Sequence, residues 1–196
     1  MLALVGPMGQ AKRAMRARHL ALRAALSEAE RASSAAAVTA LLLDLPEVRE
    51  ARAVAAYVGV GTELPTLPLL DALRGRGVRV LLPVLLADDG LAWGTYDGTL
   101  VEGRRGLREP ATAGASLDEA DVVVVPGVAY DPSGRRLGRG GGSYDRALAV
   151  VRVPVVGVAL DAEVVDEVPV EPHDRRVDVV VTPARVLRAG LPGEPG

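Results

Sequence analysis

Short apolar runs alternate with helix-forming segments along most of the chain. The clearest run is VVVV at 122–125, which is typical of a strand covered on both faces. Similar runs occur at 51–60, 78–85, 153–160 and 177–183. Strands that alternate with helices form largely parallel sheets with helices packed on them. The pattern therefore predicts an α/β fold, and 196 residues fit a single domain.

The helices are expected between these runs. Residues 11–26 are rich in Ala, Leu and Arg, which favour helix. Ser27 followed by Glu30 matches a capping box, so a second helix should start there and end near Leu45. Two shorter helices are predicted at 67–77 and 144–151. Residues 91–98 have a weak strand pattern, 101–110 are expected to form a loop, and 1–10 and 188–196 are expected to be loose tails.

Composition excludes several classes of function. The net charge of -2 gives no general affinity for nucleic acid or acidic membranes. Because the chain has no cysteine, disulfides and thiolate metal sites are excluded. No apolar run approaches the roughly 18 residues needed to span a membrane. We therefore expect a cytoplasmic protein without nucleic acid or membrane as a partner. Separately from composition, we also expect a monomer with small-molecule partners.

The segment GRRLGRGGGSYDRAL at 134–148 holds five glycines and four arginines. Its spacing matches neither the P-loop nor the dinucleotide-binding fingerprint. Glycines allow backbone amides to approach an anion closely, and arginines add charge-assisted hydrogen bonds. A flexible linker is the alternative, but the position between a buried strand and a helix favours a phosphate site. Asp145 suits such a site only if a cation such as magnesium lies between its carboxylate and the phosphates.

Lys12 is the only lysine among 23 basic residues. The chain also has no Ile, Phe or Asn, so a compositional bias of the genome explains most of the arginine. One interpretation is that Lys12 merely escaped this bias. The other is that its position requires a compact ammonium, which the planar guanidinium of arginine does not imitate. Composition leaves both open.

With these residues in view, the sequence resembles the 5-formyltetrahydrofolate cyclo-ligase family, also called 5,10-methenyltetrahydrofolate synthetase. The specific match is PGVAYDPSGRRLGRGGGSYDRAL at 126–148. Further matches in the same order are KRAMR, YVGVGTELPT, LPV, REP and VPVEPHDRRVDVVVTP, spread from Lys12 to Pro183. The resemblance implies a three-layer α/β/α fold. It also implies an ATP- and Mg²⁺-dependent ligase that converts 5-formyltetrahydrofolate into 5,10-methenyltetrahydrofolate, with release of ADP and phosphate.

The resemblance also assigns residues. Arg139 and Tyr144 are expected to be catalytic, and Val58, Glu63 and Tyr144 to bind the folate. Magnesium is expected at Asp145 and Asp174, with Asp178 as an alternative to Asp174, and His173 is expected to have a hydrogen-bonding or structural role. The residues expected to bind ATP are Lys12, Arg13, Arg16, Arg136, Leu137, Gly138, Arg139, Gly140, Gly141, Gly142, Ser143 and Tyr144.

Ser143 is where the loop departs from many family members, which carry an aromatic residue immediately before the Tyr-Asp step. If that ring stacks on the pterin, folate affinity is the property that Ser143 affects. Two rival functions share the predicted site. One is another phosphate-ligand enzyme of similar fold, such as a sugar-phosphate isomerase or a CoA-handling protein. The other is a nucleic-acid contact, which the near-neutral charge and the lack of interleaved aromatics argue against.

Overall fold

The computed structural model of the protein describes residues 6–171 and 174–190. A central sheet of seven strands has the order β11-β10-β9-β6-β1-β2-β3. The five inner strands are parallel, whereas β3 and β11 pair antiparallel at the two edges. The strands of this sheet are β1 (Ala53–Ala55), β2 (Arg79–Leu85), β3 (Leu91–Thr95), β6 (Val122–Pro126), β9 (Val155–Val158), β10 (Val179–Val181) and β11 (Val186–Arg188).

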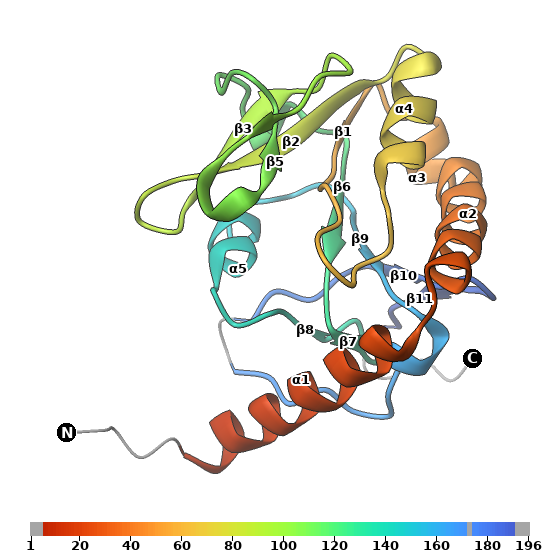
Figure 1. The fold of residues 1–196 in the computed structure, drawn as a ribbon, viewed down its shortest axis with the longest axis vertical. Coiled ribbons are helices and arrows are strands. Elements are labelled where there is room, and N and C mark those ends of the chain that lie inside the picture. The colour runs from red at the N-terminus through yellow and green to blue at the C-terminus, as the bar shows by residue number, and fades with distance from the viewer. Residues whose placement is uncertain (1–5, 172–173, 191–196) are drawn as a thin grey trace.

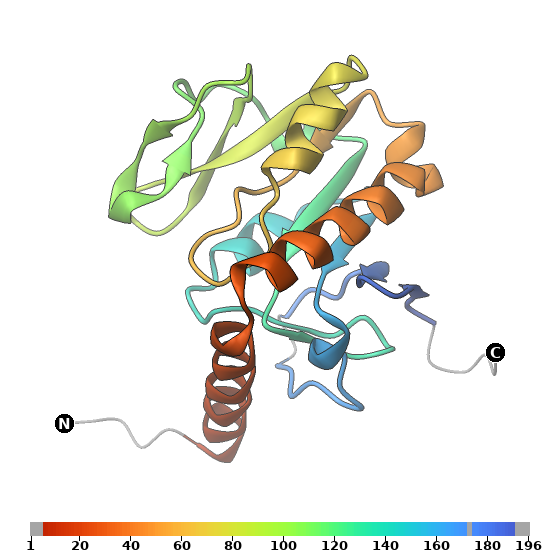
Figure 2. The same cartoon turned by 45° about the vertical axis from the view of Figure 1, so that its right-hand side comes forward.

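Helices cover both faces of the sheet, which confirms the three-layer α/β/α fold (Figure 1). One face carries α2, α3 and α4, and the other carries α5. Helix α1 extends along the end of the molecule where the short strands β7 (Ala129–Tyr130) and β8 (Arg136–Leu137) lie (Figures 1 and 2). The helices are α1 (Pro7–Ala25), α2 (Glu28–Asp44), α3 (Pro46–Arg49), α4 (Leu67–Gly75) and α5 (Ser143–Leu148). No helix of the described ranges is long and apolar enough to cross a bilayer.

Successive residues of the inner strands enter different cores, because side chains in a strand alternate between faces. In β6, Val122 and Val124 pack under α2 and α4, whereas Val123 and Val125 pack with α5. All four side chains are buried, as the VVVV run predicts. From α2, the buried residues Ala35, Val38 and Leu42 form the stripe of one helix face.

The predicted helix boundaries hold closely. The Ser27 hydroxyl accepts a hydrogen bond from the Glu30 amide, and the Glu30 carboxylate accepts one from the Ser27 amide, which completes the capping box. The first helix differs from expectation, since it begins at Pro7 rather than near residue 11. Proline is favoured at a first helical position, because its fixed φ suits a helix and its missing N–H is not needed. Residues 7–10 are thus helical, and the ends at 1–5 and 191–196 lie outside the described residues.

Three other boundaries were wrong. The first strand ends at Ala55 rather than near Gly59, because the following chain turns back through Thr66, whose hydroxyl donates to Tyr57 O and accepts from the Gly59 amide. Residue 188 belongs to β11 and not to a tail. The expected loop at 101–110 contains a hairpin, because Arg105 adopts a left-handed φ of 56° that closes a tight turn. Its strands are β4 (Val101–Glu102) and β5 (Arg108–Glu109).

Candidate active site

The sheet reverses its winding direction between β1 and β6, because the chain proceeds from β1 to β2 on one side while β6, β9 and β10 lie on the other. Ligands in such sheets bind beyond the carboxyl ends of the strands at this switch point. Two cavities lie there, of about 310 and 360 Å³. The first is lined by residues at the ends of β1 and β6, namely Tyr57, Pro126 and Gly127. The second lies between α1 and residues 138–142, which we call the glycine-rich loop.

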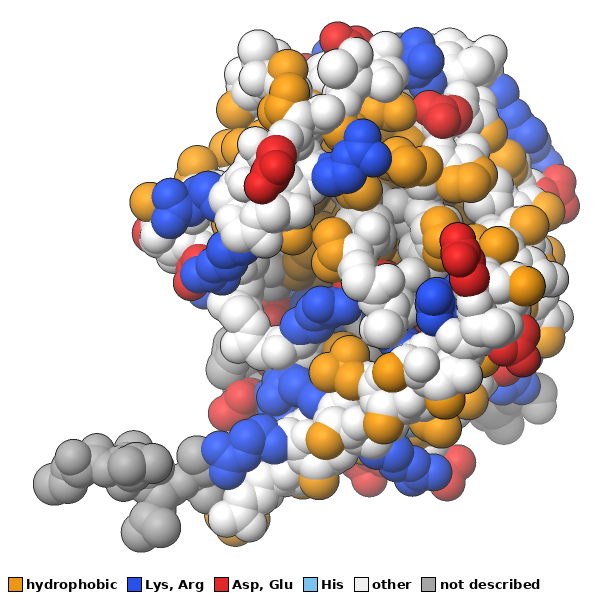
Figure 3. Space-filling view, in the orientation of Figure 1, with side chains coloured by type: hydrophobic (Ala, Val, Ile, Leu, Met, Phe, Trp, Pro, Cys, Tyr) orange, Lys and Arg blue, Asp and Glu red, His pale blue; other side chains and the backbone are white. Residues whose placement is uncertain are grey.

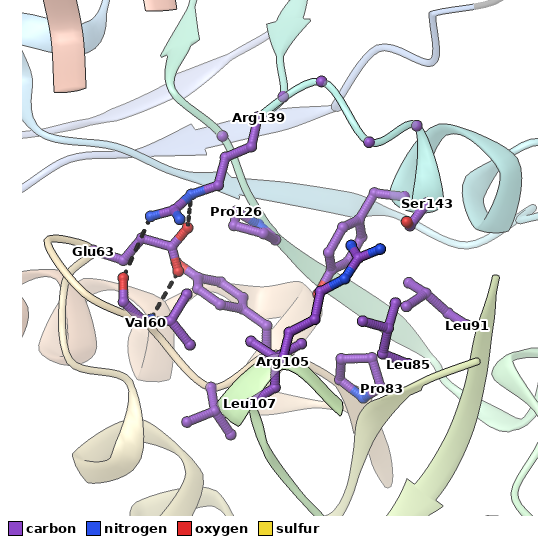
Figure 4. Close-up of a pocket in the computed structure, with 18 of the residues that line it drawn as sticks. Val60, Glu63, Pro83, Leu85, Leu91, Arg105, Leu107, Pro126, Arg139 and Ser143 are labelled. Atoms are coloured by element: carbon purple, nitrogen blue, oxygen red, sulfur yellow. Dashed lines mark hydrogen bonds and ion pairs between the residues drawn. The ribbon is translucent and has the colours of Figure 1, made fainter. Parts of the chain in front are cut away.

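The first cavity is mainly apolar. Val58 and Val60 follow β1, and Pro83 and Leu85 belong to β2. Figure 4 shows Val60, Pro83 and Leu85 around a common space. One carboxylate faces this space on the β1 side, that of Glu63. An apolar slot with the buried Glu63 carboxylate facing its open space suits a flat heterocycle whose N–H groups need an acceptor. Val58 and Glu63, both predicted to bind folate, therefore line one cavity.

Glu63 is held in place by its own loop and by the glycine-rich loop. Its Oε2 accepts a hydrogen bond of 2.9 Å from the Val60 amide, and its Oε1 lies 3.0 Å from Arg139 Nε. Arg139 also donates to Val60 O at 3.3 Å (Figure 4). The Glu63 side chain is buried, whereas that of Arg139 is about half exposed. The predicted phosphate residue Arg139 thus contacts the predicted folate residue Glu63.

The second cavity is polar and strongly charged. Lys12, Arg13 and Arg16 line it from α1, and the glycine-rich loop lines it from the other side. Figure 3 shows several Lys and Arg side chains gathered on this side of the molecule, along and above α1. Arg16 Nε donates to Gly138 O at 2.8 Å, which connects the helix to the loop. Three cations on one helix opposite backbone glycines form a site suited to a polyphosphate.

Lys12 lies between two carboxylates. Its Nζ is 2.7 Å from Glu171 Oε2 and 2.6 Å from Asp174 Oδ2. Burial alone lowers the pKa of Lys12, but the hydrogen bonds and charges of Asp174 and Glu171 outweigh burial, so the net pKa is raised above its ordinary value. Lys12 is therefore charged and buried, which supports the interpretation that its position requires an ammonium. Glu171 was not singled out from the sequence, although it lies in the same VEPHD segment as Asp174.

Arg136 and Leu137 form β8 (Arg136–Leu137), which pairs with β7 (Ala129–Tyr130). Arg136 is buried and lines both cavities, but its guanidinium donates to Pro126 O at 3.1 Å and to Asp145 Oδ1. The Leu137 side chain packs in a small core cluster. Leu137 also lines the second cavity, so it stays a predicted ATP-binding residue that would contact phosphate through its main chain.

The glycine-rich loop is the wall between the two cavities. Gly138, Gly140 and Gly142 line both of them, as do Arg136 and Asp145. Gly140 and Gly142 have positive φ values of 106° and 68°, a conformation that side-chain-bearing residues rarely adopt. Because these residues have no side chains, only a single backbone segment separates the two cavities. A ligand group in one cavity can therefore approach a ligand group in the other.

Tyr144 and Ser143 begin α5 and line the first cavity. Burial, followed by the nearby Glu63 carboxylate, raises the pKa of Tyr144 far above its ordinary value, so its phenol stays protonated. The Tyr144 ring is partly buried and packs against both core clusters. Ser143 lines the same cavity with its small side chain (Figure 4).

Two of the three carboxylates considered for magnesium lie at the second cavity. Asp145 and Asp174 both line the second cavity, and each is within ion-pair distance of a cation. Asp178 instead accepts a hydrogen bond from the Val155 amide and lines neither cavity. In the described ranges no three carboxylates or imidazoles lie close enough together to hold a metal ion by themselves. A cation here would therefore use one or two carboxylates together with phosphate oxygens, which is the usual arrangement for magnesium. His173 lies outside the described residues.

The sequence reasoning missed two cationic residues of the first cavity, Arg105 and Arg108. Both belong to the hairpin that was expected to be a loop. The REP motif at 108–110 was a signal that this segment matters, but it gave no role for the arginines.

Comparisons with known proteins agree on one family. The 5-formyltetrahydrofolate cyclo-ligase family model matches residues 8–183. The 5-formyltetrahydrofolate cyclo-ligase of Mycolicibacterium smegmatis is 47% identical over 149 residues, which cover 70% of this chain and 77% of the relative. That of Escherichia coli is 37% identical over 155 residues, covering 74% and 85%.

A solved structure gives the same result. The 5,10-methenyltetrahydrofolate synthetase of Aquifex aeolicus superposes with a TM-score of 0.83 at 31% identity, covering 94% of this chain and 96% of that one. The family match thus includes α1 with Lys12, the glycine-rich loop and both cavities. The chain belongs to the 5-formyltetrahydrofolate cyclo-ligase family.

Proposed function

We propose that this protein uses ATP and Mg²⁺ to convert 5-formyltetrahydrofolate into 5,10-methenyltetrahydrofolate, releasing ADP and phosphate, as a monomer in the cytoplasm. The observation that carries the proposal is the pair of cavities in a member of this family. The first cavity is mainly apolar and holds the Glu63 carboxylate, the second is charged and holds three cations from α1, and the glycine-rich loop lies between them. A folate suits the first environment and a triphosphate suits the second, and phosphoryl transfer between them requires that the two cavities be adjacent.

The reaction has to convert the formyl oxygen, which is a poor leaving group, into a good leaving group. The oxygen of an N-formyl group leaves with difficulty, so the γ-phosphoryl group is first transferred to that oxygen and ADP is released. N10 then bonds to the formyl carbon, the carbon–oxygen bond breaks, and phosphate departs as N10 loses its proton. Phosphoryl transfer asks mainly for positioning and for stabilisation of charge. The described residues provide both without a nucleophilic side chain.

The first cavity is assigned to the folate. Glu63 is oriented by the Val60 amide, and its carboxylate can accept two parallel hydrogen bonds from pterin N–H groups. Val58 contributes an apolar wall, and the Tyr144 ring offers a face for stacking. The formyl group would then lie toward the glycine-rich wall, where the phosphoryl group has to reach it.

The second cavity is assigned to the triphosphate. Lys12, Arg13 and Arg16 line it from α1, while Gly138, Gly140 and Gly142 line it from the glycine-rich loop. Arg139 is close to both cavities, because it belongs to this loop and contacts Glu63. We assign to Arg139 the stabilisation of charge on the transferred phosphoryl group. Binding requires the internal ion pair of Arg139 to exchange for a pair with phosphate, which is feasible because its guanidinium is half exposed.

Asp145 and Asp174 are the residues that would hold magnesium, which neutralises phosphate charge when bound. Without the cation, Asp145 pairs with Arg136 and Asp174 pairs with Lys12. Each carboxylate therefore already lies beside a cation that lines the second cavity.

The test is turnover of 5-formyltetrahydrofolate by the purified protein, followed by the near-ultraviolet absorbance of the methenyl product. Product should form only when ATP and magnesium are both present, with one ADP released per product. Absence of product at every magnesium concentration would refute the proposal. ATP hydrolysis that is not stimulated by the folate would instead favour another phosphate-ligand enzyme of this fold.

A further inference from the structure

The β4–β5 hairpin contributes two arginines to the first cavity that the proposed chemistry does not use. Arg105 lies at the hairpin tip and Arg108 lies on β5. Both line the first cavity and neither lines the second. Figure 4 shows the Arg105 side chain extending across the cavity, with its guanidinium toward Ser143. An apolar cavity with two cations from one hairpin is suited to a ligand that has an anionic end.

The hairpin is well anchored, so the position of these arginines is set by the fold. Glu109 is buried, and its carboxylate accepts a hydrogen bond of 2.9 Å from the Leu85 amide of β2. The turn itself is closed by the Gly103 amide, which donates to Leu107 O at 2.7 Å. Arg105 has a left-handed φ of 56°, which is uncommon for a residue with a side chain. The Arg105 side chain thus leaves a fixed turn at the edge of the cavity.

The two hairpin arginines are more available to a ligand than the other cations of the cavity. Arg136 pairs with Asp145, and Arg139 pairs with the buried Glu63. Arg105 pairs with Asp89 at 2.6 Å, but its side chain is 66% exposed and that of Asp89 is 42% exposed.

Exposed ion pairs contribute little to stability, so a ligand carboxylate can replace Asp89 at small cost. No residue of the described ranges forms an ion pair with Arg108.

We propose that Arg105 and Arg108 form a subsite for the carboxylates of the glutamate tail of the folate; this inference rests on the proposed function. A folate has a pterin at one end and a glutamate with carboxylates at the other. If Glu63 holds the pterin, the tail must leave through the open side of the cavity, where Arg105 is exposed. Arginine is suited to carboxylates because its planar fork can donate two parallel hydrogen bonds.

The alternative occupant of the subsite is a phosphate group of ATP, which has the same charge. The position of the arginines argues against it, because phosphate contacts are assigned to the second cavity and the hairpin does not reach that cavity. The two alternatives differ in which KM should depend on the hairpin arginines. A tail subsite affects the KM for the folate, whereas a phosphate subsite affects the KM for ATP.

The experiment compares two substrates, 5-formyltetrahydrofolate and 5-formyltetrahydropteroate, which lacks the glutamate. Arg105→Ala is expected to raise the KM for 5-formyltetrahydrofolate about tenfold, as loss of a charge-assisted hydrogen bond does, with kcat nearly unchanged. The KM for 5-formyltetrahydropteroate and that for ATP should not change. Arg108→Ala should act in the same direction, and Arg105→Lys should recover part of the loss.

Arg104→Ala is the matched control, because Arg104 lies in the same turn, is exposed, and does not line the cavity. It should leave both folate KM values unchanged. Equal effects of Arg105→Ala on the two folate substrates, or no effect on either, would overturn the proposal. A selective rise in the KM for ATP would assign Arg105 to phosphate instead and would also overturn it.

A binding measurement separates this inference from the proposed function. Calorimetry with p-aminobenzoylglutamate and with p-aminobenzoate needs no turnover. The wild-type protein should bind the glutamate-bearing fragment more tightly, and Arg105→Ala should remove this difference. If the wild type forms no methenyl product but the difference is present, the proposed function fails and the anionic subsite remains. If the difference is missing in the wild type, the subsite proposal fails whatever the turnover.

Discussion

Arg139 Nε lies 3.0 Å from Oε1 of Glu63, so a cation of the glycine-rich loop is paired with the carboxylate of the apolar cavity. In the same structure Lys12 is paired with Asp174, and Arg136 with Asp145. The charged groups assigned to the substrates therefore form ion pairs with one another. Loss of one partner from such a pair leaves a charge without compensation, which is costly where the pair is buried, so a ligand has to replace the partner that it displaces.

Glu63→Gln is expected to weaken folate binding specifically. The glutamine side chain can still accept the hydrogen bond from the Val60 amide, but it loses the charge and one of the two acceptor oxygens. The KM for 5-formyltetrahydrofolate should rise at least about tenfold, in line with loss of about 1.5–3 kcal/mol for a hydrogen bond to a charged group. The KM for ATP should stay the same or fall, since Arg139 is released. Steady-state kinetics with each substrate varied in turn checks this, and a larger rise in the KM for ATP would contradict it.

Lys12→Ala is expected to act on ATP. The ammonium is buried between Glu171 and Asp174, and without it two carboxylates would face the incoming phosphates. The KM for ATP should rise about tenfold or more, while the KM for the folate should change less than about twofold, as loss of a charge-assisted contact implies. Lys12→Arg should recover only part of the affinity, because the guanidinium fork is larger.

Arg18→Ala is the control for Lys12, because Arg18 is an exposed residue of the same helix that lines neither cavity. It should leave both KM values unchanged. The assigned role of Lys12 would be refuted by equal changes of both KM values in Lys12→Ala.

The buried pair of Arg23 and Glu163 predicts a stability effect. Arg23 donates to both Glu163 oxygens and also to Gly127 O, which connects α1 to the floor of the first cavity. Arg23→Leu leaves Glu163 as a buried unpaired carboxylate, so the free energy of unfolding should fall by about 3–5 kcal/mol. Urea denaturation measures the change. The double variant Arg23→Leu/Glu163→Leu should recover much of this loss, because it removes both buried charges; a double variant less stable than the single one would contradict the explanation.

Burial of His19 should make the free energy of unfolding depend on pH. It is almost fully buried on α1, and burial lowers its pKa below the ordinary value of 6.5. The Glu163 charge opposes this shift, and Arg18 and Arg23 add to it. Below about pH 6.5 the unfolded chain therefore binds a proton at His19 that the folded protein does not, so the free energy of unfolding should decrease as the pH falls.

The check is a series of urea denaturations of the wild type and of His19→Leu between about pH 5 and pH 8, the range in which histidine titrates. The wild type should lose stability below about pH 6.5 more steeply than the variant. His173 is present in both proteins, so its titration does not affect the difference. Parallel curves for the two proteins would show that His19 does not cause the effect.

The sequence predicts the sheet and the main helices because their signals are local. The VVVV run at 122–125 and the Ser27–Glu30 capping box each lie within a few residues, and the structure confirms both. The hairpin at 101–110 was missed because its turn depends on Arg105 in a left-handed conformation, which arginine seldom adopts. Its strands are also only two residues long, so no alternation of apolar and polar residues is visible.

The sequence predicts which residues belong to the site, but not which of them contact one another. The glycine-rich loop, Lys12 and Glu63 were found from residue chemistry and resemblance, and all line the two cavities. The pairing of Lys12 with Asp174 joins residues 162 positions apart, and no local pattern indicates it. The buried state of Arg136 was not predicted either, because an arginine in a glycine-rich segment is usually taken to be exposed, whereas here β8 carries it inward.

The wall of glycines has a consequence for how ligand affinities are measured. Because Gly138, Gly140 and Gly142 border both cavities, the conformation of one backbone segment sets the shape of two sites. A ligand that orders this segment lowers the entropy cost for its neighbour, and by thermodynamic reciprocity the neighbour does the same in return. The dissociation constant of either substrate is therefore a property of the pair, and a value measured for one substrate alone describes a different equilibrium from the one that operates during turnover.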